Sequence, residues 1–352
     1  MRLAYLLDTY PSNSETFIAR EIEALRGQEF KIEVFALNAG EGATAISQGW
    51  LGKLSPRRWQ GLGSRLDLSG FDHVHAGWAN HLALVAQSAA GRAGLPWSFS
   101  AHARDLWVEG GDLKAKLASA KFATSCTLAG TRELQRFGAN VIYAPHGLEL
   151  KRYKFRPWRK RDRVRIVGVG RLVEKKGWMD ARDAVNRLDE LLNLSLDAKT
   201  HARLILVGDG PLMNPLLKKV GYSVDPLLRL YGALPHNQAI KVIRRCDCLI
   251  LPSRRTREGD RDGLANVLLE AGALGLPIVT TNAGSACDFV DETTGIVVEA
   301  GDVDALTSAL WRVFAEPEQT LWRCENARRR VEERFDVNRN IAVLAGAFRG
   351  TL

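Results

Sequence analysis

The 352-residue chain alternates short apolar runs with amphipathic stretches along its whole length. Short apolar runs bounded by turn residues are typical of buried strands, and apolar residues at helical spacing between them indicate helices. The pattern predicts strands at 3–7, 31–36, 73–75, 97–100, 122–124, 141–144, 164–169, 203–207, 227–231, 248–251, 277–280 and 296–298. Such alternation predicts the α/β class, with parallel sheets wound on both sides by helices.

Two such domains are the simplest organisation for this length. We expect an N-terminal Rossmann-like domain at 1–155, a C-terminal one at 156–334 and a cleft between them. The segment 303–352 is helical throughout, with breaks at Pro317 and at Phe335–Asp336. The segment is longer than the single helix that would complete the second domain. Residues 335–352 are therefore predicted to pack back on the first domain.

Composition is that of a soluble globular protein, with 46% hydrophobic and 25% charged residues. No run approaches the roughly 20 apolar residues that cross a bilayer. The first apolar run, Met1–Leu7, is too short for the core of a signal peptide. The five cysteines are scattered and lack the spacing of a zinc site, so we expect reduced thiols in a cytoplasmic protein.

The formal charge of +9 is concentrated in Lys151–Arg165, where basic residues alternate with Tyr153, Phe155 and Trp158. Basic and aromatic side chains together favour nucleic acid or an anionic membrane. A solvated linker between domains is the alternative. Because nothing resembles a nucleic-acid module, we expect a linker or contact with the inner face of a membrane, and no nucleic-acid partner.

The segment DGLANVLLEAGALGLPIVTT, residues 262–281, carries most of the chemical information. It predicts a helix that begins at Asp262 and Gly263, which is how α/β enzymes present a helix N-terminus to phosphate. Glu270 lies about 100° from the centre of the apolar stripe, on a flank from which it reaches ligand hydroxyls. Asp262 as a simple N-cap is the alternative, and it leaves Glu270 unexplained.

The sequence GVGRLVEKKG begins at the end of the strand 164–169 and lacks the third glycine of a dinucleotide motif. Arg171 and Lys176 on this loop suit a diphosphate, because a guanidinium can donate hydrogen bonds to two phosphate oxygens and an ammonium group adds a positive point charge. A charged surface loop is the alternative. Asp260-Arg261-Asp262 spells DxD, for which divalent-metal binding is the less favoured interpretation.

In the first domain, the spacing of Ser12 and Glu15 predicts a capping box at the start of a helix. A well-capped helix accounts for this spacing alone. The functional alternative is that Ser14 and Thr16 place hydroxyls at a strand's carboxyl end, where ligands collect. His102 also lies just past a strand end and is a candidate for hydrogen bonding or proton handling, while His75 and His146 are weaker candidates.

Taken together, these pieces resemble the GT-B glycosyltransferases of family 4, which are retaining and use nucleotide sugars. The resemblance covers nearly the whole chain and lies in an ordered set of blocks, namely SETFIAREIEAL, FSAHARDLW, GVGRLVEKKGW, LILVGDGPL and DGLANVLLEAGALGLPIV. The first block is similar to a subgroup that makes bacterial surface polysaccharides.

The resemblance implies that Arg171 and Lys176 hold the donor's diphosphate and stabilise it as it leaves. Glu270 would bind ribose, and His102 would contact the transferring sugar. Asp262 stands where the family has a glutamate, which leaves the identity of the sugar open. The full set of expected donor-side residues is Gly170, Arg171, Lys176, Gly208, Leu234, Asp262, Gly263, Leu264, Ala265, Asn266 and Glu270.

On the acceptor side the expected residues are Ser14, Glu15, Thr16 and His102, and the expected catalytic groups are Arg171, Lys176, His102 and Asp262. The acceptor would be a saccharide or a lipid-linked saccharide. No cofactor and no metal are expected. Three alternatives remain: a sugar-nucleotide epimerase or phosphorylase of the same fold, a catalytically silent sugar-nucleotide-binding protein, and, third, a nucleic-acid-binding protein.

Overall fold

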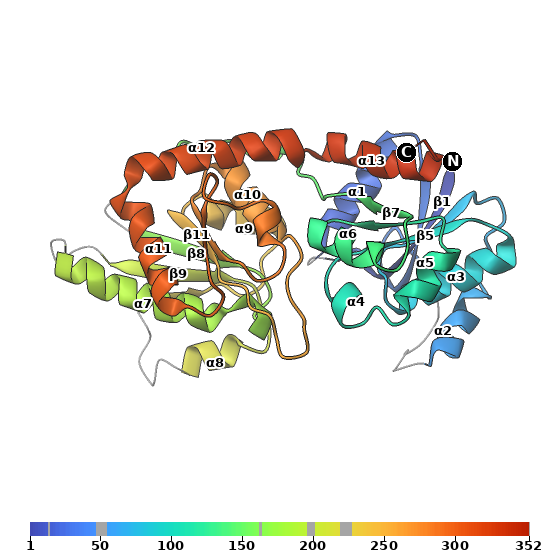
Figure 1. The fold of residues 1–352 in the computed structure, drawn as a ribbon, viewed down its shortest axis with the longest axis horizontal. Coiled ribbons are helices and arrows are strands. Elements are labelled where there is room, and N and C mark those ends of the chain that lie inside the picture. The colour runs from blue at the N-terminus through green and yellow to red at the C-terminus, as the bar shows by residue number, and fades with distance from the viewer. Residues whose placement is uncertain (13–14, 47–54, 162–163, 196–200, 219–226, 352) are drawn as a thin grey trace. The chain divides into compact units, whose positions relative to one another are not determined.

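The computed structural model describes residues 1–12, 15–46, 55–161, 164–195, 201–218 and 227–351. Contacts divide the chain into two compact units. The first comprises Met1–Gly147 with Val337–Leu352, and the second comprises Leu148–Asp336. The first division lies eight residues before the boundary expected at 155/156, and the second lies two residues after the boundary expected at 334/335. Each unit holds one sheet with helices around it (Figure 1).

The first unit is built around a seven-stranded parallel sheet of order β3-β2-β1-β4-β5-β6-β7. Its elements are β1 (Arg2–Tyr10), α1 (Thr16–Gly27), β2 (Lys31–Ala39), β3 (Thr44–Ala45), α2 (Pro56–Gly63), β4 (His73–Ala76), α3 (His81–Ala93), β5 (Trp97–Ala101), α4 (Arg104–Trp107), α5 (Leu113–Ser119), β6 (Phe122–Ser125), α6 (Leu128–Gln135), β7 (Val141–Tyr143) and α13 (Val337–Arg349).

Alternate residues of β1 enter two separate cores, as the two-residue period of a strand requires. Leu3 and Tyr5 pack on one face with side chains of α1 and α13. Ala4 and Leu6 pack on the other face with side chains of α3. Apolar burial on both faces explains why the strands read as continuous apolar runs.

The second unit has a six-stranded parallel sheet of order β10-β9-β8-β11-β12-β13. Its elements are η1 (Leu150–Arg152), β8 (Val164–Val169), η2 (Glu174–Lys176), α7 (Trp178–Ser195), β9 (Ala202–Val207), α8 (Met213–Lys218), β10 (Leu228–Leu230), α9 (His236–Ile243), β11 (Cys248–Leu251), α10 (Asn266–Leu274), β12 (Ile278–Thr281), η3 (Ala286–Asp288), β13 (Ile296–Val298), α11 (Val303–Ala315) and α12 (Pro317–Arg334).

The strand pattern of the sequence is confirmed, because each of the twelve predicted strands exists within a few residues of its expected position. The short strand β3 was not predicted, since two exposed residues give no apolar run. The predicted capping box at Ser12 and Glu15 is wrong. Helix α1 begins at Thr16, with Glu15 at its N-cap and no capping hydrogen bond from that side chain.

The basic segment Lys151–Arg165 is not solvated along its whole length, because two of its three aromatic side chains lie in the core of the second unit. Tyr153 is 2% and Trp158 7% exposed. The indole Nε1 of Trp158 donates to the carbonyl oxygen of Asp247 at 2.8 Å. The Asp247 carboxylate is paired with Arg161 and Arg165 at 3.3 Å each. The basic stretch is therefore anchored at its aromatic residues, and only part of its charge faces solvent.

A ladder of buried polar side chains crosses β4, β5 and β6 in the first unit. The Oγ of Ser98 lies 2.7 Å from one ring nitrogen of His73 and 2.7 Å from one of His75. His75 also reaches Ser100 at 3.0 Å, and Ser100 reaches Thr124 at 2.8 Å. Both histidines are fully buried. Burial lowers the pKa of His73 to about 3, helped by the charge of Lys121, so its ring is neutral.

This neutral histidine predicts acid sensitivity of the first unit. The folded-state pKa of about 3 lies below the unfolded value near 6.5, so the unfolded state binds the extra proton between these values. Stability should therefore fall as pH drops below about 6.5. In His73→Gln, the slope of unfolding free energy against pH should be smaller by about 1.4 kcal/mol per pH unit in this window. Urea unfolding at several pH values measures it, and an unchanged slope would contradict the assignment.

Candidate active site

The second unit has a switch point between β8 and β11, where the order of its strands reverses direction. Ligands of doubly wound folds bind outside the carboxyl ends of the strands at such a point. The loop after β8 carries Arg171 and Lys176, and the loop after β11 carries Asp262. The strand order thus places three of the predicted residues on the two loops that flank the switch point.

Two lysines of the first loop face two aspartates of the second. The Nζ of Lys176 lies 2.9 Å from Asp262, whose carboxylate also accepts from the Ser253 hydroxyl at 2.6 Å. The Nζ of Lys175 lies 2.9 Å from Asp260 and 3.9 Å from Asp262. Burial alone would raise the pKa of Asp262, but the charges of both lysines and its hydrogen bonds hold that pKa below its usual value.

This arrangement changes the interpretation of the DxD sequence. Ammonium groups stand at the Asp260 and Asp262 carboxylates, where a divalent cation would have to bind. Lys175 was not predicted to belong to the site, because the sequence does not distinguish its role from that of the adjacent Lys176. Its side chain is buried, so it anchors the loop while its neighbour lies closer to the surface.

The backbone of the β8 loop is fixed while the side chain of Arg171 is exposed. The carbonyl of Arg171 accepts from the indole Nε1 of Trp178 at 2.9 Å. The next residue, Leu172, donates its N–H to the Asp209 carbonyl at 2.8 Å. A rigid loop that carries an exposed guanidinium suits a phosphate ligand.

Gly208 is required by a close approach of two loops. Its φ is +145°, and a Cβ there would lie 1.9 Å from the carbonyl oxygen of Gly170. Only glycine allows this contact, which presses the loops after β8 and β9 together. Both glycines were predicted on the donor side, and the structure gives them this packing role.

Helix α10 begins at Asn266, four residues later than the sequence suggested. Asp262 is not its N-cap, because its carboxylate is held by Lys176 and Ser253. Ala265 occupies the N-cap position and has no capping hydrogen bond from its side chain. The first N–H groups of the helix have no capping side chain, and such groups bind anions. Leu264 is buried, so it can offer a ligand only its backbone; Gly263 is partly buried.

Glu270 is buried within α10 instead of lying on an exposed flank. Its Oε1 lies 2.8 Å from the Nε2 of His236 and accepts from the hydroxyl of Tyr153 at 3.4 Å. His236 begins α9, two residues after Leu234, which is partly buried. Neither partner was predicted from the sequence, since nothing in their local pattern points to a carboxylate on another helix.

The first unit brings together candidates that the sequence treated separately. His102 follows β5, and its ring centroid lies 5.3 Å from that of His146, which follows β7. Phe17 of α1 stacks on His146 with centroids 4.1 Å apart. His75 does not join them, because it belongs to the buried ladder. Glu15 and Thr16 lie at the start of α1, and Ser14 lies outside the described residues.

The expectations on thiols and membrane spans can be compared with the described residues. All five cysteines are thiols, and no disulfide joins them. Over the part of the chain that the structure describes, none of the helices has both the length and the apolar character needed to cross a bilayer.

Comparison with known proteins finds a family model that matches part of the second unit and relatives that match parts of the chain. Residues 163–316 match the family model described as glycosyl transferases group 1. A GDP-mannose-dependent monoacylated alpha-(1-6)-phosphatidylinositol monomannoside mannosyltransferase of Corynebacterium glutamicum is 32% identical over 43% of this chain and 38% of its own length. The putative teichuronic acid biosynthesis glycosyltransferase TuaC of Bacillus subtilis is 25% identical over 78% of this chain and 69% of its own. The chain spans less than half the length of the first of these relatives.

Solved structures with the same fold cover both units. A glycosyltransferase from Rickettsia africae has a TM-score of 0.78 and 12% identity, and the match covers 99% of this chain and 98% of the other. Anabaena Alr3699/HepE, solved in complex with UDP, has a TM-score of 0.74 and 17% identity, and the match covers 99% and 100%. The α/β, GT-B fold expected from the sequence is confirmed.

The contact at Gly208 yields a stability prediction. Gly208→Ala should destabilise the second unit by about 1–3 kcal/mol, because the new methyl group must push the Gly170 carbonyl away. Gly91→Ala is the matched control. Gly91 lies in α3 with nothing near its added Cβ, so alanine should stabilise there by about 0.5–1 kcal/mol. Urea unfolding measures both, and equal effects of the two variants would contradict the packing argument.

Proposed function

Because residues 163–316 match the family model described as glycosyl transferases group 1, we propose that this protein is a retaining glycosyltransferase. It transfers a sugar from a nucleoside diphosphate sugar to a saccharide or lipid-linked acceptor in the synthesis of a cell-surface polysaccharide or glycolipid. The observation that carries the proposal is the switch point of the second unit, where an exposed arginine, a lysine and the uncapped end of a helix share one edge of the sheet.

The donor's diphosphate binds at the loops after β8 and β11. Arg171 supplies a guanidinium, Lys176 an ammonium, and the N-terminus of α10 adds backbone N–H groups and the positive end of its dipole. Three cations, Arg171, Lys175 and Lys176, stand with two carboxylates, Asp260 and Asp262. Each lysine is paired with an aspartate, so the exposed Arg171 is the cation that is most open to an anionic ligand.

Catalysis follows from where negative charge develops. When the bond between sugar and phosphate breaks, charge builds on the departing diphosphate, and prearranged donors lower the barrier if they are aimed there. Asp262 holds Lys176 in place at 2.9 Å, so it acts on the phosphate through the lysine. The departing phosphate itself assists deprotonation of the acceptor, and the reaction needs neither a cofactor nor a metal.

Glu270 binds the ribose hydroxyls of the donor, with Leu234 at the nucleobase. His236 acts as a positioning residue, because its Nε2 holds the Glu270 carboxylate at 2.8 Å. In the first unit, Glu15, Thr16 and His102 serve the acceptor and the transferring sugar. His102 is suited to this by its position directly after β5 at the carboxyl edge of the sheet.

The protein works at the cytoplasmic face of a membrane. Because Tyr153 and Trp158 are buried, contact with anionic lipid is electrostatic and uses the exposed charges of the basic segment, among them Lys151, Lys154 and Lys160.

Removal of either diphosphate cation tests the mechanism. Arg171→Ala and Lys176→Ala should each lower turnover by about 10²–10³-fold, because each removes a charged donor from the leaving group. Lys114→Ala, at an exposed lysine of α5, should have no effect. The donor is first identified by thermal shift with UDP-, GDP-, ADP- and CMP-sugars. Product formation is then measured with and without acceptor. Near-normal turnover in both variants would refute the assignment, and conversion without an acceptor would indicate an epimerase.

Truncation of the Glu270 partner tests the ribose site. His236→Ala should weaken donor binding by about tenfold or more, because a hydrogen bond to a charged group contributes about 1.5–3 kcal/mol. His236→Gln, which can still donate to the carboxylate, should restore part of this loss. Asn237→Ala, at the exposed neighbouring residue, is the control. Calorimetric titration with the donor measures all three, and equal affinity of His236→Ala and the control would exclude the positioning role.

A further inference from the structure

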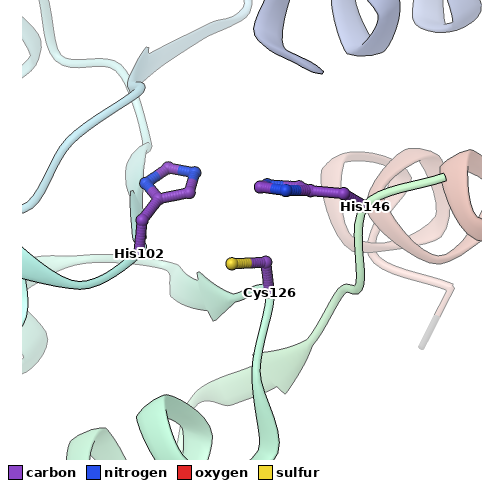
Figure 2. Close-up of side chains that lie close together, drawn as sticks. All are labelled: His102, Cys126 and His146. Atoms are coloured by element: carbon purple, nitrogen blue, oxygen red, sulfur yellow. The ribbon is translucent and has the colours of Figure 1, made fainter. Parts of the chain in front are cut away.

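Three side chains with metal-binding atoms meet at the carboxyl edge of the sheet in the first unit. His102 follows β5, Cys126 follows β6 and His146 lies three residues after β7. These three strands are neighbours in the sheet, so their ends lie side by side. One ligand atom from each residue lies within 4.8 Å of the other two. Figure 2 shows the two imidazole rings and the thiol pointing toward a common space.

The distances are close to those of a metal centre. Zinc binds histidine nitrogen at about 2.0–2.1 Å and cysteine sulfur at about 2.3 Å, which in a tetrahedron separates the ligand atoms by about 3.3–3.6 Å. From 4.8 Å, the ligand atoms would have to approach one another by about 1.2–1.5 Å, which side-chain movement can supply. Two imidazoles and one thiolate suit Zn²⁺, and a tetrahedral ion keeps its fourth position open for water.

The surroundings prepare these groups for an ion. The Nδ1 of His102 is buried without a hydrogen-bond partner and lies 3.8 Å from the Asp105 carboxylate. Asp105 is itself fixed by the N–H groups of Ala79, His102 and Ala103 at 3.0 Å. A carboxylate behind a histidine sets its tautomer and orientation, which is the usual outer partner of a metal-bound imidazole.

The second histidine is held in place by its neighbours. The ring of Phe17 stacks on the His146 ring, and the backbone carbonyl of His146 accepts a hydrogen bond from the Asn340 side chain at 3.1 Å. The ring plane and the chain segment are thus both fixed before any ion binds.

We propose that His102, Cys126 and His146 form a binding site for one Zn²⁺ ion in the first unit. All three residues belong to the first unit, and the site takes no part in the proposed departure of the diphosphate. Because His102 also serves the transferring sugar in the proposed function, an occupied site would withdraw that imidazole from the saccharide.

Cobalt provides a direct test on the full-length chain. Metal-free protein titrated with Co²⁺ should bind one equivalent and show a thiolate-to-cobalt charge-transfer band, which added Zn²⁺ then abolishes. Cys126→Ser should lose the band and bind Zn²⁺ more weakly by over about 100-fold, the upper end of the loss typical for an outer partner. Cys287→Ser, at an exposed cysteine outside the cluster, should keep the band and the affinity.

A variant of a second proposed metal ligand separates loss of the metal site from loss of the fold. His146→Gln should keep one imidazole and the thiol, and therefore retain a weakened band, while circular dichroism verifies that each variant is folded. Absence of stoichiometric cobalt binding to the wild-type chain, or a band that survives Cys126→Ser, would overturn the proposal. Neither donor nor acceptor is present in these measurements, so their outcome is independent of that of the proposed glycosyl transfer.

Discussion

The pairing of Lys176 with Asp262 joins the two loops on which the candidate phosphate site depends. The loops belong to β8 and β11, which are neighbours in the sheet although some eighty residues separate them in the chain. Without the lysines, two carboxylates would be buried next to the proposed diphosphate site, and their charge would repel such a ligand. With the lysines, the same carboxylates hold ammonium groups in place. The site is therefore neutralised from within before any ligand arrives.

The sequence predicted the fold well because the signals for parallel strands are local. Apolar runs such as 248–251 and 277–280 are buried on both faces, and burial of this kind does not depend on knowing the partner strand. The predicted end of the strand also indicated which side chains lie at the carboxyl edge, as for His102. Where a signal was missing, as in the two exposed residues of β3, the prediction failed.

Side-chain partners were harder to predict, because they are set by tertiary contacts between distant segments. Aspartate is a residue type favoured at N-caps, so Asp262 was predicted to begin the helix. Its carboxylate pairs with lysines some 85 residues earlier, and the helix begins at Asn266. Glu270 was expected on an open flank, but His236 and Tyr153 reach it from two other segments. Helical periodicity gives the direction of a side chain relative to its own helix only. It contains no information on which other element covers that direction.

The ladder of His73, Ser98, His75 and Ser100 has a consequence for how the first unit selects a single native alignment. Apolar strands pair almost equally well in several registers, since valine or alanine tolerates many neighbours. Here a shift of β5 by one residue would turn both serines to the opposite face and leave two buried imidazoles facing Phe99. The misaligned sheet would contain unsatisfied polar groups in an apolar interior, at a cost of several kcal/mol. The serine hydroxyl groups therefore specify the register of β5 against β4, because any other alignment loses their hydrogen bonds. A sheet with only aliphatic side chains would lack this specificity.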